Sequence, residues 1–288
     1  MQLGQPSKTA LGAAGLRAAH QTLDRGVIFS DPLALRILGS DADALLRNLE
    51  NDPARKKLRW FIAVRSRVAE DALAQAAGDG AAQLVVLGAG LDTYAYRTTP
   101  AATLRIFEVD HPETQAWKRQ RLAEAAIPVP DHVRYVPVDF ERDTLADCLT
   151  ASGFDRTKRT FFTWLGVVPY LTESAILATL GYIAALPGGA DVVFDYVNPP
   201  ETMVDPARRA AHDALAQRVA AIGETIKGYF DTDDLCAKLS GLGFRDVRDL
   251  DPAGIAARFF SDRSISMRGK GAHIMHASTV AQVRTAPD

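Results

Sequence analysis

Leu84–Arg97 reads LVVLGAGLDTYAYR, and this stretch decides the fold class. A run of four β-formers, Leu84–Leu87, leads into Gly88-Ala89-Gly90, which is typical of a buried strand that ends in a tight turn. Glycine has no Cβ, so a ligand can lie directly against the backbone of such a turn. The stretch therefore predicts that a nucleotide-like cofactor binds where the strand ends.

The turn departs from the dinucleotide fingerprint G-x-G-x-x-G at the third glycine. Thr93 stands in that place, and Asp92 precedes it. A carboxylate beside the turn disfavours a pyrophosphate and favours a cationic ligand such as S-adenosyl-L-methionine (SAM), which carries a sulfonium and an ammonium group. We therefore favour SAM. An NAD(P)-dependent oxidoreductase is the alternative, and a purely steric G-x-G turn without a ligand is a third interpretation.

A second predicted strand, Leu104–Asp110, also ends in a carboxylate. Asp110 follows Gly90 by about 20 residues, the spacing at which an acidic side chain binds ribose hydroxyls in nucleotide-binding βαβ units. A carboxylate can accept hydrogen bonds from both hydroxyls at once. The alternative is that Asp110 caps a helix that begins near His111-Pro112.

A third predicted strand, Val133–Phe140, ends in the same way. Asp139 can accept a hydrogen bond from an adenine amino group, and Phe140 offers contact with the ring. The alternative for Asp139 is a helix cap or an acidic loop residue. In open α/β sheets ligands bind at the carboxyl ends of the strands, so the three strand ends together predict one cofactor site.

Four segments of the chain resemble a known family: LGAGLDTYAYR, FEVDHPETQAWKRQRL, VPVDFER and FFTWLGVVPYL. They are similar to the SAM-dependent methyltransferases related to leucine carboxyl methyltransferase, and most of all to the bacterial O-methyltransferases found near polyketide and other secondary-metabolite genes. The resemblance runs from about Thr9 to the predicted C-terminal strand. It implies O-methyl transfer from SAM to a small-molecule carboxylate or hydroxyl in secondary metabolism.

The resemblance also implies roles for the residues at the strand ends. Gly88 and Gly90 would face the methionine part of SAM. Asp110 would hold the ribose, and Asp139 with Phe140 would hold the adenine. These assignments agree with the cofactor site that the strand ends predict.

Arginines are implied as partners of the SAM carboxylate. The family binds this group through an arginine on the helix before the first strand, for which Arg67 is our first choice and Arg65 our second. Arg17 in the N-terminal segment is a further candidate.

The acceptor pocket shows one departure from the family. The leucine carboxyl methyltransferases carry a glutamate near the end of the fourth strand, where this chain has Leu165. Leu165 makes that part of the pocket more apolar, argues against the protein substrate of the eukaryotic relatives, and keeps a non-catalytic SAM-binding protein as an alternative. Tyr170 and Tyr196 lie near predicted strand ends and are candidates to line the pocket. The sequence offers no dedicated general base, so no catalytic residue is assigned.

Alternating strands and helices predict an α/β fold with a seven-stranded, mostly parallel, Rossmann-like class I methyltransferase sheet. By resemblance, the last strand is reversed and inserted beside the fifth. Residues 1–80 are expected to form a helical lid and substrate segment, and residues 81–288 the SAM-binding core. The remaining expected strands are Thr160–Trp164, Ala190–Val197, Phe244–Leu250 and Ala272–Ser278.

Composition limits the classes of partner that we expect. A formal net charge of −2 gives no basic excess, which argues against nucleic acid as a partner. No stretch approaches the ~20 apolar residues of a membrane span, and no secretory signal is expected. The two cysteines, Cys148 and Cys236, lie far apart without metal-ligand spacing, so we expect no metal and a reducing cytoplasm. The expected partner is a small-molecule methyl acceptor.

Overall fold

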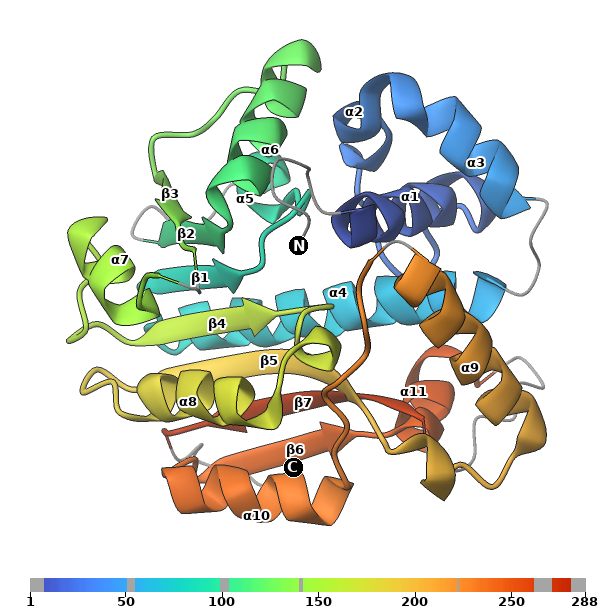
Figure 1. Ribbon diagram of the computed structural model, residues 1–288. Coiled ribbons are helices and arrows are strands. Elements are labelled where there is room, and N and C mark those ends of the chain that lie inside the picture. Colours follow the sequence, from blue (N-terminus) through green and yellow to red (C-terminus); the bar gives the residue numbers. More distant parts are fainter. Residues whose placement is uncertain are drawn as a thin grey trace.

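Seven strands form one sheet in the order β3-β2-β1-β4-β5-β7-β6 in the computed structural model of the chain (Figure 1). The structure describes residues 8–50, 55–98, 104–139, 142–221, 223–261 and 271–280. The strands are β1 Gln83–Leu87, β2 Arg105–Asp110, β3 Val133–Pro137, β4 Thr160–Trp164, β5 Ala190–Val197, β6 Asp246–Leu250 and β7 Ala272–Ser278. All pairs are parallel except those of β7, which runs antiparallel to β5 and β6. The expected sheet, with its reversed strand beside the fifth, is confirmed.

The strand boundaries follow the sequence closely. β4, β5 and β7 begin and end at the expected residues. β3 stops at Pro137, earlier than expected, where proline offers no N–H to a ladder. β6 begins at Asp246 rather than Phe244, because the Phe244 N–H still donates to the Leu239 carbonyl of the preceding helix at 3.2 Å.

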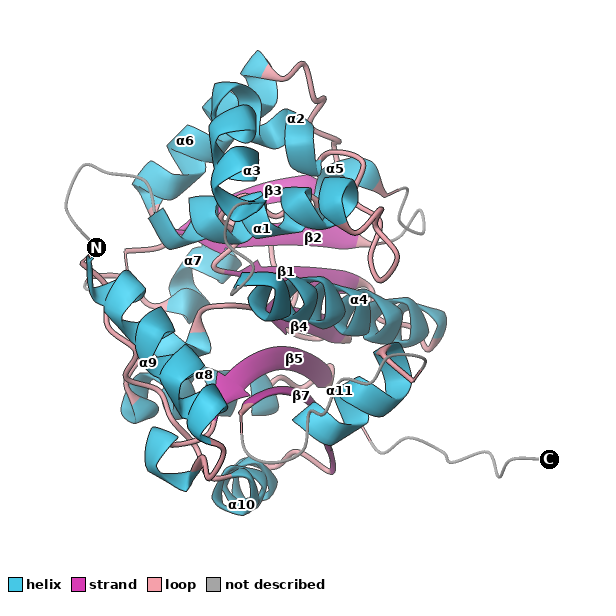
Figure 2. Ribbon diagram, turned by 90° about the vertical axis from the view of Figure 1, so that its right-hand side faces the viewer, coloured by secondary structure: helices cyan, strands magenta, loops and turns pink. Residues whose placement is uncertain are grey.

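Helices connect the strands and cover both faces of the sheet (Figures 1 and 2). They are α1 Lys8–Leu23, α2 Ala34–Leu38, α3 Ala42–Glu50, α4 Lys56–Gly78, α5 Tyr94–Arg97, α6 Pro112–Glu124, α7 Leu145–Ala151, α8 Glu173–Ala184, α9 Pro206–Ala221, α10 Thr232–Leu242 and α11 Pro252–Phe259, with 3₁₀ turns η1 Gly39–Asp41, η3 Val168–Tyr170 and η4 Pro200–Thr202. The N-cap of α10 is Asp231, whose side chain accepts from the Asp233 N–H at 3.0 Å.

Two apolar layers hold the sheet. Val85 and Leu87 of β1 point to the face covered by α7, α8 and α10. Leu84 and Val86 point to the opposite face, where α4 and α11 pack. All five residues of β1 are buried, as expected for a central strand covered on both sides. Burial of this strand fixes the position of the glycine turn that follows it.

The helices α1, α2 and α3, together with α9, gather beyond the ends toward which β1 and β4 point (Figure 1). We call α1–α3 the helical cap. Ala14 and Ala18 of α1 pack with Ile37 and Leu38 of α2, and the same cluster includes Leu91 of the glycine turn. The cap therefore has its own small core, which reaches the predicted cofactor site.

Helix α4 packs differently, although the sequence places it in the N-terminal segment 1–80. Its Val64 and Leu73 lie in the apolar layer that also contains β1 residues. The division of the chain at residue 80 stays a prediction. Among the described helices, none combines the length and the apolar character that crossing a bilayer requires.

Candidate cofactor site

The glycine turn after β1 has the backbone that only glycine adopts easily. Gly88 and Gly90 have φ values of 67° and 42°. A Cβ on Gly88 would collide with Val167 Cγ2, and a Cβ on Gly90 would lie 3.0 Å from the Ala10 Cβ of α1. The N–H groups of Gly88 and Ala89 donate to the Val109 carbonyl of β2 at 2.9 and 3.0 Å. The turn is thus narrow, held to β2, and closely approached by the helical cap.

Asp110 stands at the end of β2 directly beside this turn. Its Oδ2 accepts from the Gly90 N–H at 2.6 Å, and its Oδ1 accepts from the His111 N–H at 2.7 Å. Burial raises the pKa of the Asp110 carboxyl, and these two backbone hydrogen bonds oppose that rise. A carboxylate offers about four lone-pair positions, so each oxygen retains the capacity to accept one more hydrogen bond.

The alternative interpretation of Asp110 as a helix cap is wrong. The N-cap of α6 is His111, whose Nδ1 accepts from the Glu113 N–H at 3.3 Å. His111 therefore caps the helix, and the Asp110 carboxylate accepts a hydrogen bond from the Gly90 N–H of the turn.

Asp92 and Leu165 line the same small cavity, which has a volume of about 20 Å³. Asp92 Oδ1 accepts from the Tyr94 N–H at 2.8 Å, so the side chain is fixed at the start of α5. Glu70 of α4 and Thr163 of β4 line the cavity as well. The structure thus brings Asp92 and Leu165 together beneath the turn, next to a carboxylate that the sequence analysis did not single out.

Asp139 follows β3 and is less enclosed. Its side chain is 26% exposed and forms an ion pair with Arg142 at 3.6 Å. The Asp139 N–H donates to Asp143 Oδ2 at 3.0 Å. Phe140, its predicted partner for the adenine, lies outside the described residues.

The two arginines of α4 differ sharply. The Arg67 side chain is 52% exposed and pairs with Asp71 at 2.7 Å, on the outer side of the helix, where Arg258 of α11 also binds Asp71. Arg65 is only 12% exposed, and its Nη1 binds Asp195 Oδ2 of β5 at 2.9 Å.

Arg65 lies at the ends of β4 and β5. The Asp195 Oδ1 atom accepts from the Gly166 N–H at 2.6 Å. A Cβ on Gly166 would lie 2.7 Å from Arg65 Nη2, so the guanidinium covers this backbone closely. Gly166 precedes Val167, the residue whose side chain contacts the Gly88 turn. Of the two α4 arginines, the structure therefore brings Arg65, and not Arg67, to the turn that faces Gly88.

Arg17 of α1 is buried and has two partners. Its Nε donates to Asp31 Oδ2 and its Nη2 donates to the Leu91 carbonyl, both at 2.6 Å. Arg17 thus reaches the glycine turn from the cap, but through the backbone that follows Gly90.

The two candidate tyrosines lie in different places. Tyr196 is fully buried between β5 and α10, where its hydroxyl bonds to Thr232 at 2.9 Å and Asp249 at 3.0 Å. Tyr170 ends η3. Burial raises the pKa of its phenol to about 12, while the nearby Arg65 guanidinium opposes that rise. Tyr170 is therefore a neutral hydrogen-bond donor near Arg65.

Sequence reasoning missed Asp195, Glu70 and Arg97. Asp195 carried a signal, because it is one of two acids, with Asp191, inside the otherwise apolar strand Ala190–Val197, and a buried charge needs a partner. Glu70 and Arg97 carried none, since their pairing joins α4 to α5 across the fold.

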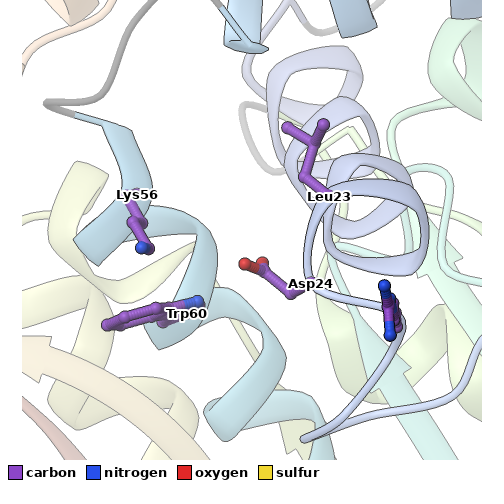
Figure 3. A pocket seen from close by; sticks show the side chains of 5 residues that line it. Leu23, Asp24, Lys56 and Trp60 are labelled. Carbon is purple, nitrogen blue, oxygen red and sulfur yellow. The ribbon is translucent and has the colours of Figure 1, made fainter. Parts of the chain in front are cut away.

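A larger cavity, of about 310 Å³, lies at the outer end of the cap (Figure 3). It is lined by Leu23, Asp24, Arg25, Lys56 and Trp60, from the end of α1 and the start of α4. Asp24 is already bound by Arg59 at 2.6 Å, and the Lys56 ammonium lies over the Trp60 ring at 4.7 Å. None of the predicted cofactor-binding residues lines this cavity.

Comparisons with known proteins give the family. A sequence model described as "Leucine carboxyl methyltransferase" matches residues 10–184, more than half of the chain. A Bacillus subtilis (strain 168) protein named "Putative S-adenosyl-L-methionine-dependent methyltransferase YktD" is 32% identical over 306 aligned residues, which cover 96% of this chain and 99% of that protein. A Mycobacterium avium (strain 104) protein with the same descriptive name is 32% identical over 221 residues, covering 73% and 74% of the two chains.

The chain belongs to the leucine carboxyl methyltransferase family. It is a SAM-dependent methyltransferase, and SAM is its cofactor. This decides against the NAD(P)-dependent oxidoreductase and against a protein that only binds SAM. A crystal structure described as a "putative methyltransferase" from Thermobifida fusca YX aligns with a TM-score of 0.58 and 17% identity over 97% of both chains, which shows the same fold.

The residues at the turn suit this cofactor. Gly88 and Gly90 keep the turn free of side chains of its own, and Asp110 retains acceptor positions for two ribose hydroxyls. Asp92 adds a carboxylate beside the turn for a ligand that carries positive charge. Among the described residues no group of histidine, cysteine and acidic side chains is placed to hold a metal ion.

Proposed function

We propose that this methyltransferase transfers the methyl group to an oxygen of a small molecule, a carboxylate or a hydroxyl, in secondary metabolism and in the cytoplasm. The family name refers to methylation of a carboxyl group, which supports oxygen as the nucleophile. The resemblance to bacterial enzymes of secondary metabolism supports the small acceptor, and the two free cysteines agree with a reducing compartment.

The proposal of a small acceptor depends on contacts that close the space over the carboxyl ends of the strands. Ala10 of α1 approaches Gly90, and Thr9 Oγ1 donates to Glu224 Oε1 at 3.0 Å. The N–H groups of Lys227 and Gly228 donate to the Pro169 carbonyl at 2.8 and 3.0 Å. The cap and the segment between α9 and α10 thus meet over the strand ends, which suits a small molecule enclosed between them better than a large partner.

We assign the cofactor roles as follows. Gly88 and Gly90 supply bare backbone beside the methionine part, and Asp92 faces its ammonium group. Asp110 accepts from the ribose hydroxyls. Asp139 with Phe140 binds the adenine.

We propose that Arg65 binds the SAM carboxylate. Arg65 lies at the ends of β4 and β5, against Gly166, where it pairs with Asp195. Arg67 is exposed on the outer side of α4, and Arg17 is held by Asp31 and the Leu91 carbonyl. Arg17 then acts as a support of the turn.

Bound SAM would supply an electrophilic methyl group: the acceptor oxygen attacks the methyl carbon in line with the carbon–sulfur bond, which breaks and releases S-adenosylhomocysteine. The protein's own contribution is to orient the acceptor and to exclude water from it. Leu165 provides an apolar surface, and the neutral Tyr170 hydroxyl donates a hydrogen bond to the acceptor. A carboxylate acceptor is already ionised at neutral pH, whereas a hydroxyl acceptor needs a base within hydrogen-bond reach.

The test is transfer of radioactive methyl from SAM to a panel of small carboxylic acids and phenols. Methyl esters release volatile methanol in alkali and methyl ethers do not, so alkaline treatment of the product tells the two acceptor classes apart. We expect labelled product with at least one class, and slower transfer by Asp110→Ala at limiting SAM. Transfer only to nitrogen, carbon or sulfur acceptors, or only to added protein, would contradict the proposal.

A further inference from the structure

A chain of buried charges joins α4 to the helical cap behind the glycine turn. Arg97 of α5 pairs with Glu70 of α4, and its Nε lies 3.2 Å from Thr93 Oγ1 and 3.7 Å from Asp31 Oδ1. Asp31 Oδ2 in turn accepts from Arg17 Nε of α1 at 2.6 Å. The side chains of Arg97, Asp31 and Arg17 are 7%, 0% and 9% exposed, and that of Glu70 is 22% exposed.

This charge chain holds the glycine turn at two points. Arg17 Nη2 donates to the Leu91 carbonyl at 2.6 Å, and Thr93 Oγ1 donates to Asp31 Oδ2 at 2.7 Å. Asp92 lies between Leu91 and Thr93 in the sequence, and so between these two points of attachment. The backbone that presents Asp92 to the cofactor is therefore fixed from behind by groups that also hold α1.

The charges balance only when Glu70 is ionised, since two arginines then face two carboxylates. Burial raises the pKa of Glu70 to about 7; the Arg97 guanidinium opposes the rise, and the Asp92 and Asp31 carboxylates add to it. For Asp31, burial acts in the same direction, but Arg17 and the Thr93 hydroxyl outweigh it and hold the pKa of that carboxyl below its usual range. Glu70 is thus the member of the chain that titrates near neutral pH.

Glu70 is mostly buried and borders the small cavity beneath the turn. The small cavity beside it holds about one water molecule, and its wall includes Leu165 and Ser66. The titratable and charged groups that face Glu70 are Arg97 and Tyr94 from α5, Asp92 from the turn and Asp31 from the loop before α2. A cation bound next to Asp92 favours the ionised form of a carboxyl in this position.

We propose that Glu70, Arg97, Asp31 and Arg17 form one positioning unit that ties the glycine turn to helix α1, and that SAM binds the state in which Glu70 is ionised. Cofactor binding then releases the proton from Glu70 and completes the chain of ion pairs. Glu70 acts through Arg97 and Asp31 and is a positioning residue. This inference rests on SAM as the cofactor and is independent of which acceptor the enzyme methylates.

The test is calorimetric titration of the full-length protein with S-adenosylhomocysteine between about pH 6 and about pH 8. We expect the affinity of the wild-type protein to fall about tenfold across this range as the pH is lowered, the limit for one linked proton. Glu70→Gln should bind weakly throughout and lose this dependence. Glu173→Gln is the matched control, because Glu173 is also an ion-paired helical glutamate but is 53% exposed and lies on α8; it should behave like the wild type.

A second measurement needs no variant. At about pH 7 roughly half of Glu70 is protonated in the free protein, so titrations in buffers of different ionisation enthalpy should show release of about half a proton on binding. Binding without proton release, or a Glu70→Gln protein with wild-type affinity and pH dependence, would overturn the inference. Either result would leave the proposed acceptor chemistry untouched, because that chemistry is tested by methyl transfer.

Discussion

Asp110 shows how one side chain serves both the fold and the cofactor. Two backbone N–H groups, from Gly90 and His111, fix the direction of its carboxylate. The carboxylate is therefore already oriented before any ligand arrives, and ordering it costs little on binding. The same rigidity makes substitutions at this residue informative.

Asp110→Ala should weaken the binding of S-adenosylhomocysteine by about 1.5–3 kcal/mol, the range for hydrogen bonds to a charged group. Calorimetry measures the affinity, and urea unfolding of the same protein shows whether it is folded. Asp110→Asn keeps the shape of the side chain but loses its charge, so its affinity should lie between those of the wild type and Asp110→Ala. Unchanged affinity in a folded Asp110→Ala protein would mean that the ribose is bound elsewhere.

The two arginines of α4 give a paired prediction. Arg65→Ala should weaken the binding of S-adenosylhomocysteine more than the binding of methylthioadenosine, which lacks the carboxylate. The reason is that the guanidinium of Arg65 is proposed to bind that group. Arg67→Ala should change both affinities little, since an exposed ion pair such as Arg67–Asp71 contributes about 0–1 kcal/mol at most. Equal losses for the two ligands in Arg65→Ala would remove the assignment.

At the scale of elements, the contact between α1 and the glycine turn depends on two kinds of interaction. Ala10 and Ala14 bring the helix close because they are small, and the Arg17–Asp31 pair links α1 to the loop before α2. A buried ion pair contributes little net stability while intact, but losing one partner leaves the other charge buried and unpaired.

Arg17→Met should therefore destabilise the protein by about 3–5 kcal/mol, measured by urea unfolding. The double variant Arg17→Met with Asp31→Asn should recover part of this loss, because no full charge is then left unpaired. Arg67→Met on the exposed side of α4 is the control and should stay within about 0.5 kcal/mol of the wild type. A small effect of Arg17→Met would show that the other partners of Asp31, Arg97 and the Thr93 hydroxyl, compensate for the lost guanidinium.

At the scale of the whole molecule, the raised pKa of Glu70 predicts opposite effects on stability and on cofactor binding. A carboxyl whose pKa rises on folding stabilises the folded state below its unfolded pKa, and this contribution disappears as the pH rises through the folded pKa, here about 7. Ionised Glu70 thus costs the cofactor-free protein stability above neutral pH.

Glu70→Gln should accordingly be more stable than the wild type at about pH 8, by on the order of 2–3 kcal/mol, and nearly equal to it at about pH 5. The same variant should bind S-adenosylhomocysteine less tightly, so stability and function move in opposite directions. Urea unfolding of the cofactor-free proteins at the two pH values measures the effect. Equal stability at both would indicate that Glu70 titrates as an ordinary exposed carboxyl.

The sequence predicted the sheet and much of the strand-end chemistry. Buried β-strands are written locally, as short apolar runs between turn signals, so Thr160–Trp164 and Ala190–Val197 were predicted to the residue. The acid at the end of β2 was also readable, because it follows the glycine turn at a characteristic spacing. The choice between Arg65 and Arg67 was not, because it depends on which side of α4 faces the sheet.

The amino-acid sequence by itself determined the family, the cofactor and the edge of the sheet where the cofactor site is proposed, since glycine turns and strand-terminal acids act through their near neighbours in the chain. Only the tertiary structure decided which arginine of α4 faces the ends of β4 and β5, how the cap is tied to the glycine turn, and that Glu70 joins the charge chain. Those features depend on contacts between residues far apart in sequence, such as Arg17 with Leu91 and Glu70 with Arg97. Their free energies come from burial, which no local pattern of residues reports.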